Sequence, residues 1–323
     1  MTVLACDIGA TRIKLGIVRE GRVLAGDVVA SQSDESLQSR LHAIAAAFRQ
    51  LCAAQGVSVS GCAGVSISVP SLVDVKSGRM LAEYGRFRDM PGLDLRAWAK
   101  SELDLPLAIE NDARMATIGE WRHGAGRGCN DLAMITLGTG LGTSVVMEGR
   151  VLRGKHGQAG CLGGHLTARY GGRPCGCGNL GCAESEASTA YLAELAKARD
   201  DFHGSPLACE PVLDFAAVFR HAAGGDACAR AIRDHSLLVW SSLAVTLIHA
   251  YDSELIILGG GIMASADVIV PVVQEFVAQH AHTPWGKVRV VASELGDAAA
   301  LVAADWLIEE QCGTGLQPVR YVQ

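Results

Sequence analysis

The sequence predicts an α/β fold divided into two domains, and three observations support this prediction. Short apolar runs alternate with amphipathic helical stretches along most of the chain, which is typical of sheets covered by helices. A plan of strand, Gly/Thr turn, strand, Gly turn and strand occurs at residues 3–29 and again at residues 132–150. The chain has 323 residues, which is enough for two domains of ordinary size. We therefore expect one copy of the plan in each domain.

Composition narrows the classes of function. The net charge is −6 and 49% of the residues are hydrophobic, which argues against a disordered chain, and no basic run suggests nucleic-acid binding. An apolar strand begins within three residues of Met1, so we expect no secretory leader, and no apolar run approaches the ~20 residues of a membrane span. Of the eleven cysteines, three are clustered at metal-binding spacing. We expect a cytoplasmic protein that binds neither nucleic acid nor membrane.

The first copy of the plan contains a candidate phosphate and magnesium site. Strand 3–7 ends in Asp7, and a turn with Thr11 leads into strands 13–19 and 23–29. Backbone N–H groups and the Thr11 hydroxyl at such a turn suit a phosphate. Asp7 could hold Mg²⁺, which favours a few carboxylates together with phosphate oxygens. A plain hairpin is the alternative for this turn taken alone.

The next candidate site follows a buried strand. Residues 35–54 and 93–103 have helical apolar spacing, whereas the apolar runs that predict strands are residues 65–69, ended by Pro70, and residues 107–109. Glu110, Asn111 and Asp112 come next, where open α/β sheets bind ligands. Asp112 could accept the proton of a substrate hydroxyl that attacks a phosphoryl group, and Asn111 could orient that substrate. Alternatively, Asp112 is the N-cap of a helix over residues 113–121.

The second copy of the plan has strands 132–137 and 143–147 around the turn Gly138–Gly142, and a third strand after Arg150. No helix follows these glycines, so the turn is not a dinucleotide-binding motif. Two phosphate-binding hairpins, one in each domain, predict that a polyphosphate is bound between the domains.

The stretch from residue 157 to residue 188 predicts a metal site. His165, Cys175, Cys177 and Cys182 form a Cys₃His set. Zn²⁺ takes such ligands in tetrahedral geometry, and four protein ligands leave no position for water, so we expect a structural zinc. The alternative is a glycine-rich surface loop with free thiols. Glu184 follows the last ligand by two residues.

The remaining segments complete the second domain. Helices are predicted at residues 186–199, 227–251, 264–280 and 298–310, and strands at residues 255–258 and 288–292. Gly259, Gly260 and Gly261 lie between a strand and a helix, where they let the backbone approach a flat ligand such as adenosine. A tight strand-to-helix turn is the alternative, although it needs one glycine and not three.

Taken together, these motifs resemble the ROK sugar kinases and repressors of the sugar kinase/actin/Hsp70 superfamily, over residues 5–306. Five segments carry the resemblance: residues 7–12 and 138–142 (phosphate motifs), 110–112 (catalytic segment), 165–184 (zinc signature) and 258–261 (adenosine segment). The resemblance implies a two-domain actin-like (ribonuclease H-like) ATPase fold with a central cleft and a structural zinc loop. The implied domains are residues 1–115, with helix 298–310 packing back on them, and residues 116–297.

The resemblance also implies a reaction: ATP-dependent phosphorylation of a hexose at its 6-hydroxyl, with glucose as the first expectation. Asp112 would be the general base. The residues expected at the sugar are Asn111, Glu184, His165, Pro70 and Glu110. Those expected to bind Mg²⁺ and the nucleotide are Asp7, Gly9, Thr11, Arg12, Gly138, Thr139, Gly140, Gly259, Gly260 and Gly261. A homodimer is also expected, since many members of the family are dimers.

There are three departures from the family pattern, and the first two leave the identity of the sugar open. Leu162 stands where the family usually has a sugar-binding Glu, with Cys161 before it, because an extra glycine enters ahead of His165. Residues 84–89 lack a common Asn, and Ala10 and Arg12 replace the usual Gly and Lys. An N-acetylhexosamine kinase and a non-catalytic sugar-binding protein are therefore alternatives. A repressor is a third alternative. Family repressors carry a helix-turn-helix ahead of the first phosphate motif, whereas here only Met1 to Leu4 precede the region of resemblance.

Overall fold

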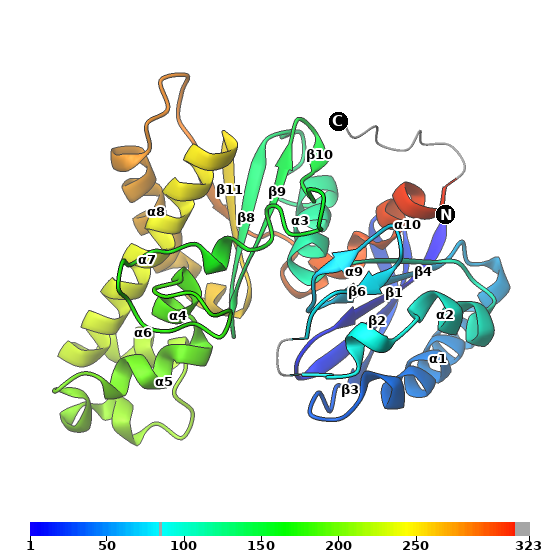
Figure 1. The fold of residues 1–323 in the computed structure, drawn as a ribbon, viewed down its shortest axis with the longest axis horizontal. Helices are drawn as coiled ribbons and strands as arrows, with labels where there is room; N and C mark the ends of the chain where they lie inside the picture. The colour runs from blue at the N-terminus through cyan, green and yellow to red at the C-terminus, as the bar shows by residue number, and fades with distance from the viewer. Residues whose placement is uncertain (84–85, 314–323) are drawn as a thin grey trace. The chain divides into compact units, whose positions relative to one another are not determined.

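The computed structural model describes residues 1–83 and 86–313 (Figure 1). These residues group into two compact units. Unit 1 contains residues 1–124, 153–158 and those from residue 297 onward, and unit 2 contains residues 125–152 and 159–296. The start of the 84–89 stretch noted above, residues 84 and 85, and the last ten residues lie outside the described residues.

The sheet of unit 1 has the strand order β3-β2-β1-β4-β7. Its strands are β1 (Thr2–Ile8), β2 (Arg12–Arg19), β3 (Arg22–Ala30), β4 (Val65–Val69) and β7 (Leu107–Asn111). The first three form an antiparallel meander, while β4 runs parallel to β1 and β7 parallel to β4. The carboxyl ends of β1, β4 and β7 therefore share one edge of the sheet, which is where open α/β sheets bind ligands.

In the part of unit 1 that the structure describes, the α-helices are α1 (Leu37–Ala54), α2 (Leu95–Leu103), α3 (Asp112–His123), α9 (Ala299–Val302) and α10 (Ala304–Cys312). The buried face of α1 includes Leu37, Ile44 and Phe48, and the Ser36 side chain caps its first turn. The last two helices pack on the sheet, and α3 packs on α9. A short ribbon of β5 (Val73–Asp74) and β6 (Arg79–Met80) follows β4.

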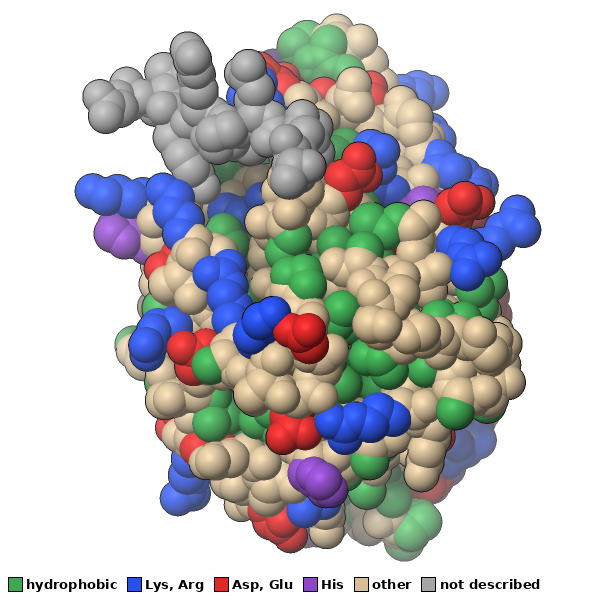
Figure 2. Space-filling model, turned by 90° about the vertical axis from the view of Figure 1, so that its right-hand side faces the viewer, with side chains coloured by type: hydrophobic (Ala, Val, Ile, Leu, Met, Phe, Trp, Pro, Cys, Tyr) green, Lys and Arg blue, Asp and Glu red, His purple; other side chains and the backbone are tan. Residues whose placement is uncertain are grey.

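The exposed charges of one face are mixed in sign. Figure 2 shows Lys and Arg interspersed with Asp and Glu, with apolar side chains between them. Exposed pairs of unit 1 such as Arg49–Glu102 and Lys100–Asp104 are of this kind. Solvent screens such exposed pairs and they contribute little, so the fold depends on the apolar core rather than on these pairs.

The sheet of unit 2 has the strand order β10-β9-β8-β11-β12 and repeats the plan of unit 1. Its strands are β8 (Leu132–Leu137), β9 (Leu141–Met147), β10 (Arg150–Val151), β11 (Leu255–Gly259) and β12 (Arg289–Ala292). The first three are again antiparallel neighbours, while β11 runs parallel to β8 and β12 parallel to β11. The duplication predicted from the sequence is confirmed at the level of strand order and direction.

The helices of unit 2 are α4 (Ala183–Ala187), α5 (Thr189–Lys197), α6 (Phe215–Ala223), α7 (Ala227–Tyr251) and α8 (Ala266–His280). The longest, α7, has the predicted bounds. Its Trp240 is fully buried and donates its indole N–H to the carbonyl of Ala187 at 2.9 Å. This bond fixes α4, which carries Glu184, against the core of unit 2.

Three predicted features differ from the structure. The helix expected over residues 186–199 is interrupted at Ser188, whose backbone is extended, because the first N–H groups of α5 donate to the carbonyls of Gly138 and Thr139. The helix expected over residues 298–310 is divided into α9 and α10. The first unit extends to residue 124 instead of ending at residue 115, since α3 packs on α9.

Within the described residues, one helical stretch has the length and mean hydropathy (1.5) of a membrane span, residues 261–280. This stretch packs against α7 and β12 as one of the helices of unit 2. Its composition alone is weak evidence for a span.

Candidate functional site

Asp7 lies near the carboxyl end of β1 with two polar neighbours. Ser68, its register partner on β4, donates its hydroxyl to Asp7 Oδ1 at 2.8 Å. Lys14, its register partner on β2, places Nζ 3.7 Å from Oδ2. Burial raises the pKa of Asp7, and Ser68 and Lys14 only partly offset it. A buried carboxylate with so little compensation is a suitable ligand for a divalent cation.

Asp112 follows β7 as the first residue of α3. Its Oδ1 accepts hydrogen bonds from the backbone N–H of Ala113 at 2.8 Å and from the side-chain amide of Asn111 at 2.9 Å. Among the described residues, Oδ2 has no hydrogen-bond partner, so it is available to a substrate. Burial, together with the charge of Asp7, raises the pKa of Asp112 to about 6. These features match a general base poised near neutral pH.

Asn111, and not Asp112, caps helix α3. Its Oδ1 accepts the N–H of Arg114 at 3.2 Å, which is the N-cap bond. Its Nδ2 also donates to the carbonyl of Ser71 at 3.2 Å, next to Pro70. The capping alternative for Asp112 is therefore wrong, and the cap leaves the Asp112 carboxylate available for chemistry.

Glu110 is placed differently from the sequence expectation of a sugar contact. Its side chain is 0% exposed. Oε1 accepts from Arg114 at 3.2 Å, and Oε2 accepts from Arg153 at 2.6 Å. Burial by itself would raise the pKa of Glu110, but the two guanidinium groups outweigh it and leave the pKa lowered. With both oxygens engaged inside unit 1, this carboxylate supports the strand end and offers no exposed atom to a ligand.

The other unit 1 candidates lie around the turn between β1 and β2. The N–H of Gly9 donates to the carbonyl of Arg12 at 3.0 Å, which closes this turn. Thr11 and Arg12 are exposed, and the Arg12 guanidinium lies 3.5 Å from Asp297. Thr11 and Arg12 therefore have side chains that an anion can reach.

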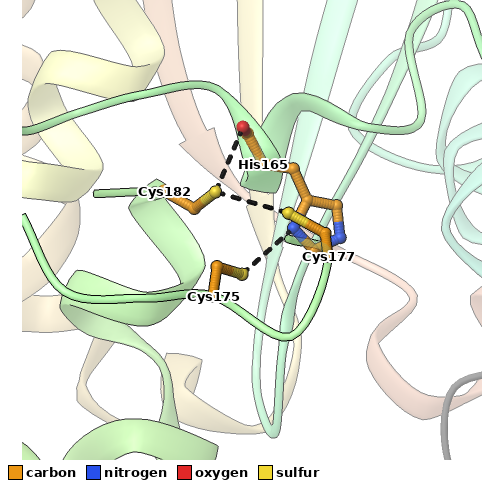
Figure 3. Close-up of side chains that lie close together, drawn as sticks. All are labelled: His165, Cys175, Cys177 and Cys182. Atoms are coloured by element: carbon orange, nitrogen blue, oxygen red, sulfur yellow. Dashed lines mark hydrogen bonds between the residues drawn. The ribbon is translucent and has the colours of Figure 1, made fainter. Parts of the chain in front are cut away.

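The predicted metal ligands of unit 2 come together in space. One ligand atom from each of His165, Cys175, Cys177 and Cys182 lies within 4.8 Å of every other. Figure 3 shows the four side chains converging from the glycine-rich loop and the start of α4. His165 Nδ1 and Cys175 Sγ are 3.6 Å apart, as are the sulfurs of Cys177 and Cys182.

These separations fit a tetrahedral ion. With Zn–S of about 2.3 Å and Zn–N of about 2.0–2.1 Å, a tetrahedron has edges of about 3.5–3.8 Å between ligand atoms. Three thiols and one imidazole nitrogen are also the donors that Zn²⁺ prefers. The cluster is therefore a possible zinc site, with His165 Nε2 left on the far side of the ring.

Glu184 connects the metal loop to the second predicted phosphate turn. Its Oε2 accepts the N–H of Leu141 at 2.9 Å, and its Oε1 lies 3.9 Å from His165 Nδ1. A Cβ added to Gly140 would lie 2.4 Å from Glu184 Oε2, so the close approach of this carboxylate requires glycine there. The Gly138–Gly140 turn is further held by the two bonds from the start of α5.

The three glycines after β11 are not equivalent. Gly260 has φ +92°, and a Cβ there would lie 2.3 Å from the carbonyl oxygen of Leu137, so the turn itself requires this glycine. Gly261 has open space around it, and packing does not require the absence of a side chain. An open backbone at Gly261 is what a flat ligand needs for close approach.

The structure thus brings the predicted residues into two sets, one in each unit. Unit 1 gathers Asp7, Asn111 and Asp112, and unit 2 gathers Glu184, the Gly138–Gly140 turn and the metal cluster. The sequence analysis missed Lys14 and Ser68, the partners of Asp7. Strand pairing could have identified Lys14, because a turn centred on residues 10–11 places it opposite Asp7.

Comparison with known proteins identifies the family. The ROK family model matches residues 3–311. A glucokinase of Halalkalibacterium halodurans is 29% identical to this chain over 313 residues, which are 94% of each chain. A glucokinase of Thermotoga maritima is 28% identical over 320 residues, which are 97% of this chain and 99% of the relative. The crystal structure of a ROK family glucokinase from Streptomyces griseus in complex with glucose and AMPPNP has a TM-score of 0.78 at 28% identity, covering 95% of this chain and 99% of that chain. The chain therefore belongs to the ROK family and has the two-domain actin-like α/β fold of its kinases.

Proposed function

We propose that this protein transfers the γ-phosphoryl group of ATP to the 6-hydroxyl of a hexose, with glucose as the leading candidate. The observation that carries the proposal is Asp112: its Oδ2 is unengaged among the described residues, and its pKa is raised to about 6. A base with this pKa is mostly ionised at pH 7 and still basic enough to accept a hydroxyl proton as the oxygen attacks. The named activities of the similar glucokinases support the same reaction.

The nucleotide contacts are assigned to the residues that the sequence motifs single out. Asp7 fits Mg²⁺, which is bound through one or two carboxylates plus phosphate oxygens and neutralises charge on the transferring group. Thr11 and Arg12, together with the backbone of Gly138, Thr139 and Gly140, are proposed to contact phosphates. Gly259, Gly260 and Gly261 are proposed to lie against the adenosine. The AMPPNP in the Streptomyces griseus structure supports ATP as the donor.

The sugar contacts are assigned to Asn111, Pro70, Glu184 and His165. A zinc ion bound by His165 and the three cysteines would fix the imidazole and the start of α4. Glu184 would then be held where a sugar hydroxyl can donate to it. Glu110 is better assigned to supporting Asn111 and Asp112 than to touching the sugar, because it is fully buried.

The test is an ADP-release assay with ATP·Mg²⁺ and a panel of glucose, mannose, allose, glucosamine, N-acetylglucosamine and N-acetylmannosamine. We expect turnover that depends on the sugar, with glucose giving the highest kcat/KM. Highest kcat/KM with an N-acetylhexosamine would favour the alternative substrate class, which the replacement of the usual Glu by Leu162 leaves open. Sugar binding by calorimetry without turnover would contradict the kinase proposal.

A further inference from the structure

Strand β7 is an edge strand of the unit 1 sheet, and a side chain of the C-terminal helix completes its outer side. Gln311 of α10 accepts the N–H of Ile109 through Oε1 at 3.1 Å. It also donates its Nε2 to the carbonyl of Ile109 at 3.1 Å. The amide thus pairs with both backbone groups of Ile109, as a neighbouring strand would do. Gln311 and Ile109 are 202 residues apart in the sequence. Ile109 precedes Asp112 by three residues.

A second contact from the same helix reaches the next residue of β7. Arg153 donates Nε to Glu110 at 2.6 Å and donates its two terminal nitrogens to the carboxylate of Glu310 at 2.9 and 2.6 Å. One planar guanidinium therefore bridges the strand end and α10. Glu110 also accepts the N–H of Asn111 at 2.9 Å, so the bridge leads directly to the segment that carries Asp112.

The bridge lies in a largely dry place. The side chains of Glu110, Arg153 and Glu310 are 0%, 12% and 17% exposed. Burial lowers the pKa of Arg153, but the charges of Glu110 and Glu310 outweigh it and leave the pKa raised. Buried ion pairs of this kind are often no more stabilising than apolar residues of the same volume, so stability alone does not account for this network. Its directed hydrogen bonds do fix orientation.

We propose that Arg153, Glu310 and Gln311, here called the C-terminal clamp, are positioning residues that hold the end of β7 so that Asp112 points at the reacting hydroxyl. This inference rests on the proposed function, in which Asp112 is the base. Among the described residues, the clamp makes no hydrogen bond to Asp112 itself. It therefore acts through Ile109 and Glu110. Misplacing a catalytic group by about 1 Å can cost about a hundredfold in rate, which is the effect that the clamp prevents.

The decisive variants are Gln311→Met and Arg153→Lys, with Glu309→Gln as the control. Gln311→Met keeps the length of the side chain and removes both bonds to Ile109. Arg153→Lys keeps the charge but cannot bridge two carboxylates in a fork. Glu309 is the exposed neighbour of Glu310 on the same helix.

We expect kcat to fall about tenfold or more in both variants with a smaller rise in KM for the sugar, because Asn111 keeps its bond to the Ser71 carbonyl while the base is misplaced. The control should keep the wild-type kcat. The assay is run at a temperature at which melting curves show every variant folded. A lower Tm with unchanged kcat in Gln311→Met would mean that the clamp is only structural, and it would overturn the proposal.

Hydrogen exchange separates a failure of the clamp from a failure of the proposed function. The Ile109 amide should exchange at least about tenfold faster in Gln311→Met than in the wild type or Glu309→Gln, whether or not the protein is a kinase. No sugar-dependent turnover in the wild-type protein would overturn the proposed function and the catalytic role of the clamp with it. Turnover in the wild type with an unchanged kcat and unchanged Ile109 exchange in Gln311→Met would overturn the clamp alone.

Discussion

The two units contain the same hairpin, but the residues at its turn differ in kind. In unit 1 the hairpin of β1 and β2 places Asp7 beside Lys14 across one register position. In unit 2 the hairpin of β8 and β9 has Thr136, paired with Gly142, at the corresponding position, followed by a turn of Gly138, Thr139 and Gly140. Side-chain charge dominates the first turn, and backbone hydrogen bonding dominates the second.

This difference divides the chemistry between the duplicated sheets. The parallel strands of unit 1 end in two carboxylates, Asp7 and Asp112, each with a pKa raised mainly by burial. Unit 2 instead fixes a neutral turn from both sides, through Glu184 and through the start of α5. A shared backbone plan therefore positions the groups, and the residues at the strand ends decide what each copy does.

The largest expected effect is on the turnover that depends on the carboxylates of unit 1. We expect Asp112→Asn to lower kcat by about 10²–10⁴-fold, because the amide cannot accept the hydroxyl proton. It can still accept the N–H of Ala113 through Oδ1, so the fold and sugar affinity should be kept. ADP release and calorimetric sugar binding measure the two quantities. Asp104→Asn, on the exposed surface, is the matched control, and a kcat for Asp112→Asn equal to the control's would sink the role of the base.

The second prediction tests what the metal cluster of unit 2 contributes to sugar binding. We expect the purified protein to contain one zinc per chain, and Cys177→Ser to lose it. Because the cluster fixes His165 and the start of α4, KM for the sugar should rise by about tenfold or more. Metal analysis and steady-state kinetics of both proteins provide the test. The exposed Cys209→Ser is the control. Full activity in zinc-free protein would show that the loop orders itself without the ion.

The sequence was sufficient for the features that depend on local pattern. The metal ligands were predicted from Cys and His spacing alone, and they converge as expected. The duplicated hairpin and the bounds of α7 also follow from local periodicity. The residues that make up each of these signals lie within about thirty positions of one another, so the chain itself limits their possible geometry.

Features that depend on distant contacts could not be predicted. Glu110 reads as a polar residue beside a candidate base, and only the packing of Arg153 and Arg114 reveals it as a buried ion-pair partner. The break at Ser188 depends on carbonyls of the turn near residue 138. Gln311 carries no local signal at all, because its partner is 202 residues away.

A smaller change tests whether Glu184 must stay in its observed position against the Gly138–Gly140 turn of unit 2. Gly140→Ala places a methyl group 2.4 Å from Glu184 Oε2, so the carboxylate must move and its bond to Leu141 is strained. We expect kcat/KM to fall by about tenfold with little change in Tm, because the displaced group is the end of a flexible side chain. Gly204→Ala, where no atom lies within 4 Å, is the matched control. If both variants behave alike, the turn tolerates displacement and Glu184 does not need its observed position.

The smallest expected effect is the folding stability that unit 1 loses by keeping Asp112 ionised near neutral pH. The pKa of Asp112 is about 6 in the folded protein and 3.8 for an ordinary Asp, so the folded state binds this proton more tightly than the unfolded state. Stability from this group is therefore present at low pH and is lost as pH rises from about 4 through 6.

Asp112→Asn lacks the penalty and should be more stable than the wild type at pH 8, by on the order of 1–2 kcal/mol, with the difference shrinking toward pH 4. In the wild type, kcat/KM should fall as pH drops below about 6, when the base is protonated. Urea unfolding of both proteins at pH 8 and pH 4.5 measures the stability difference. A variant less stable than the wild type at pH 8 would mean that the Asp112 carboxylate stabilises unit 1, and that the fold does not give up stability to keep a base at the end of β7.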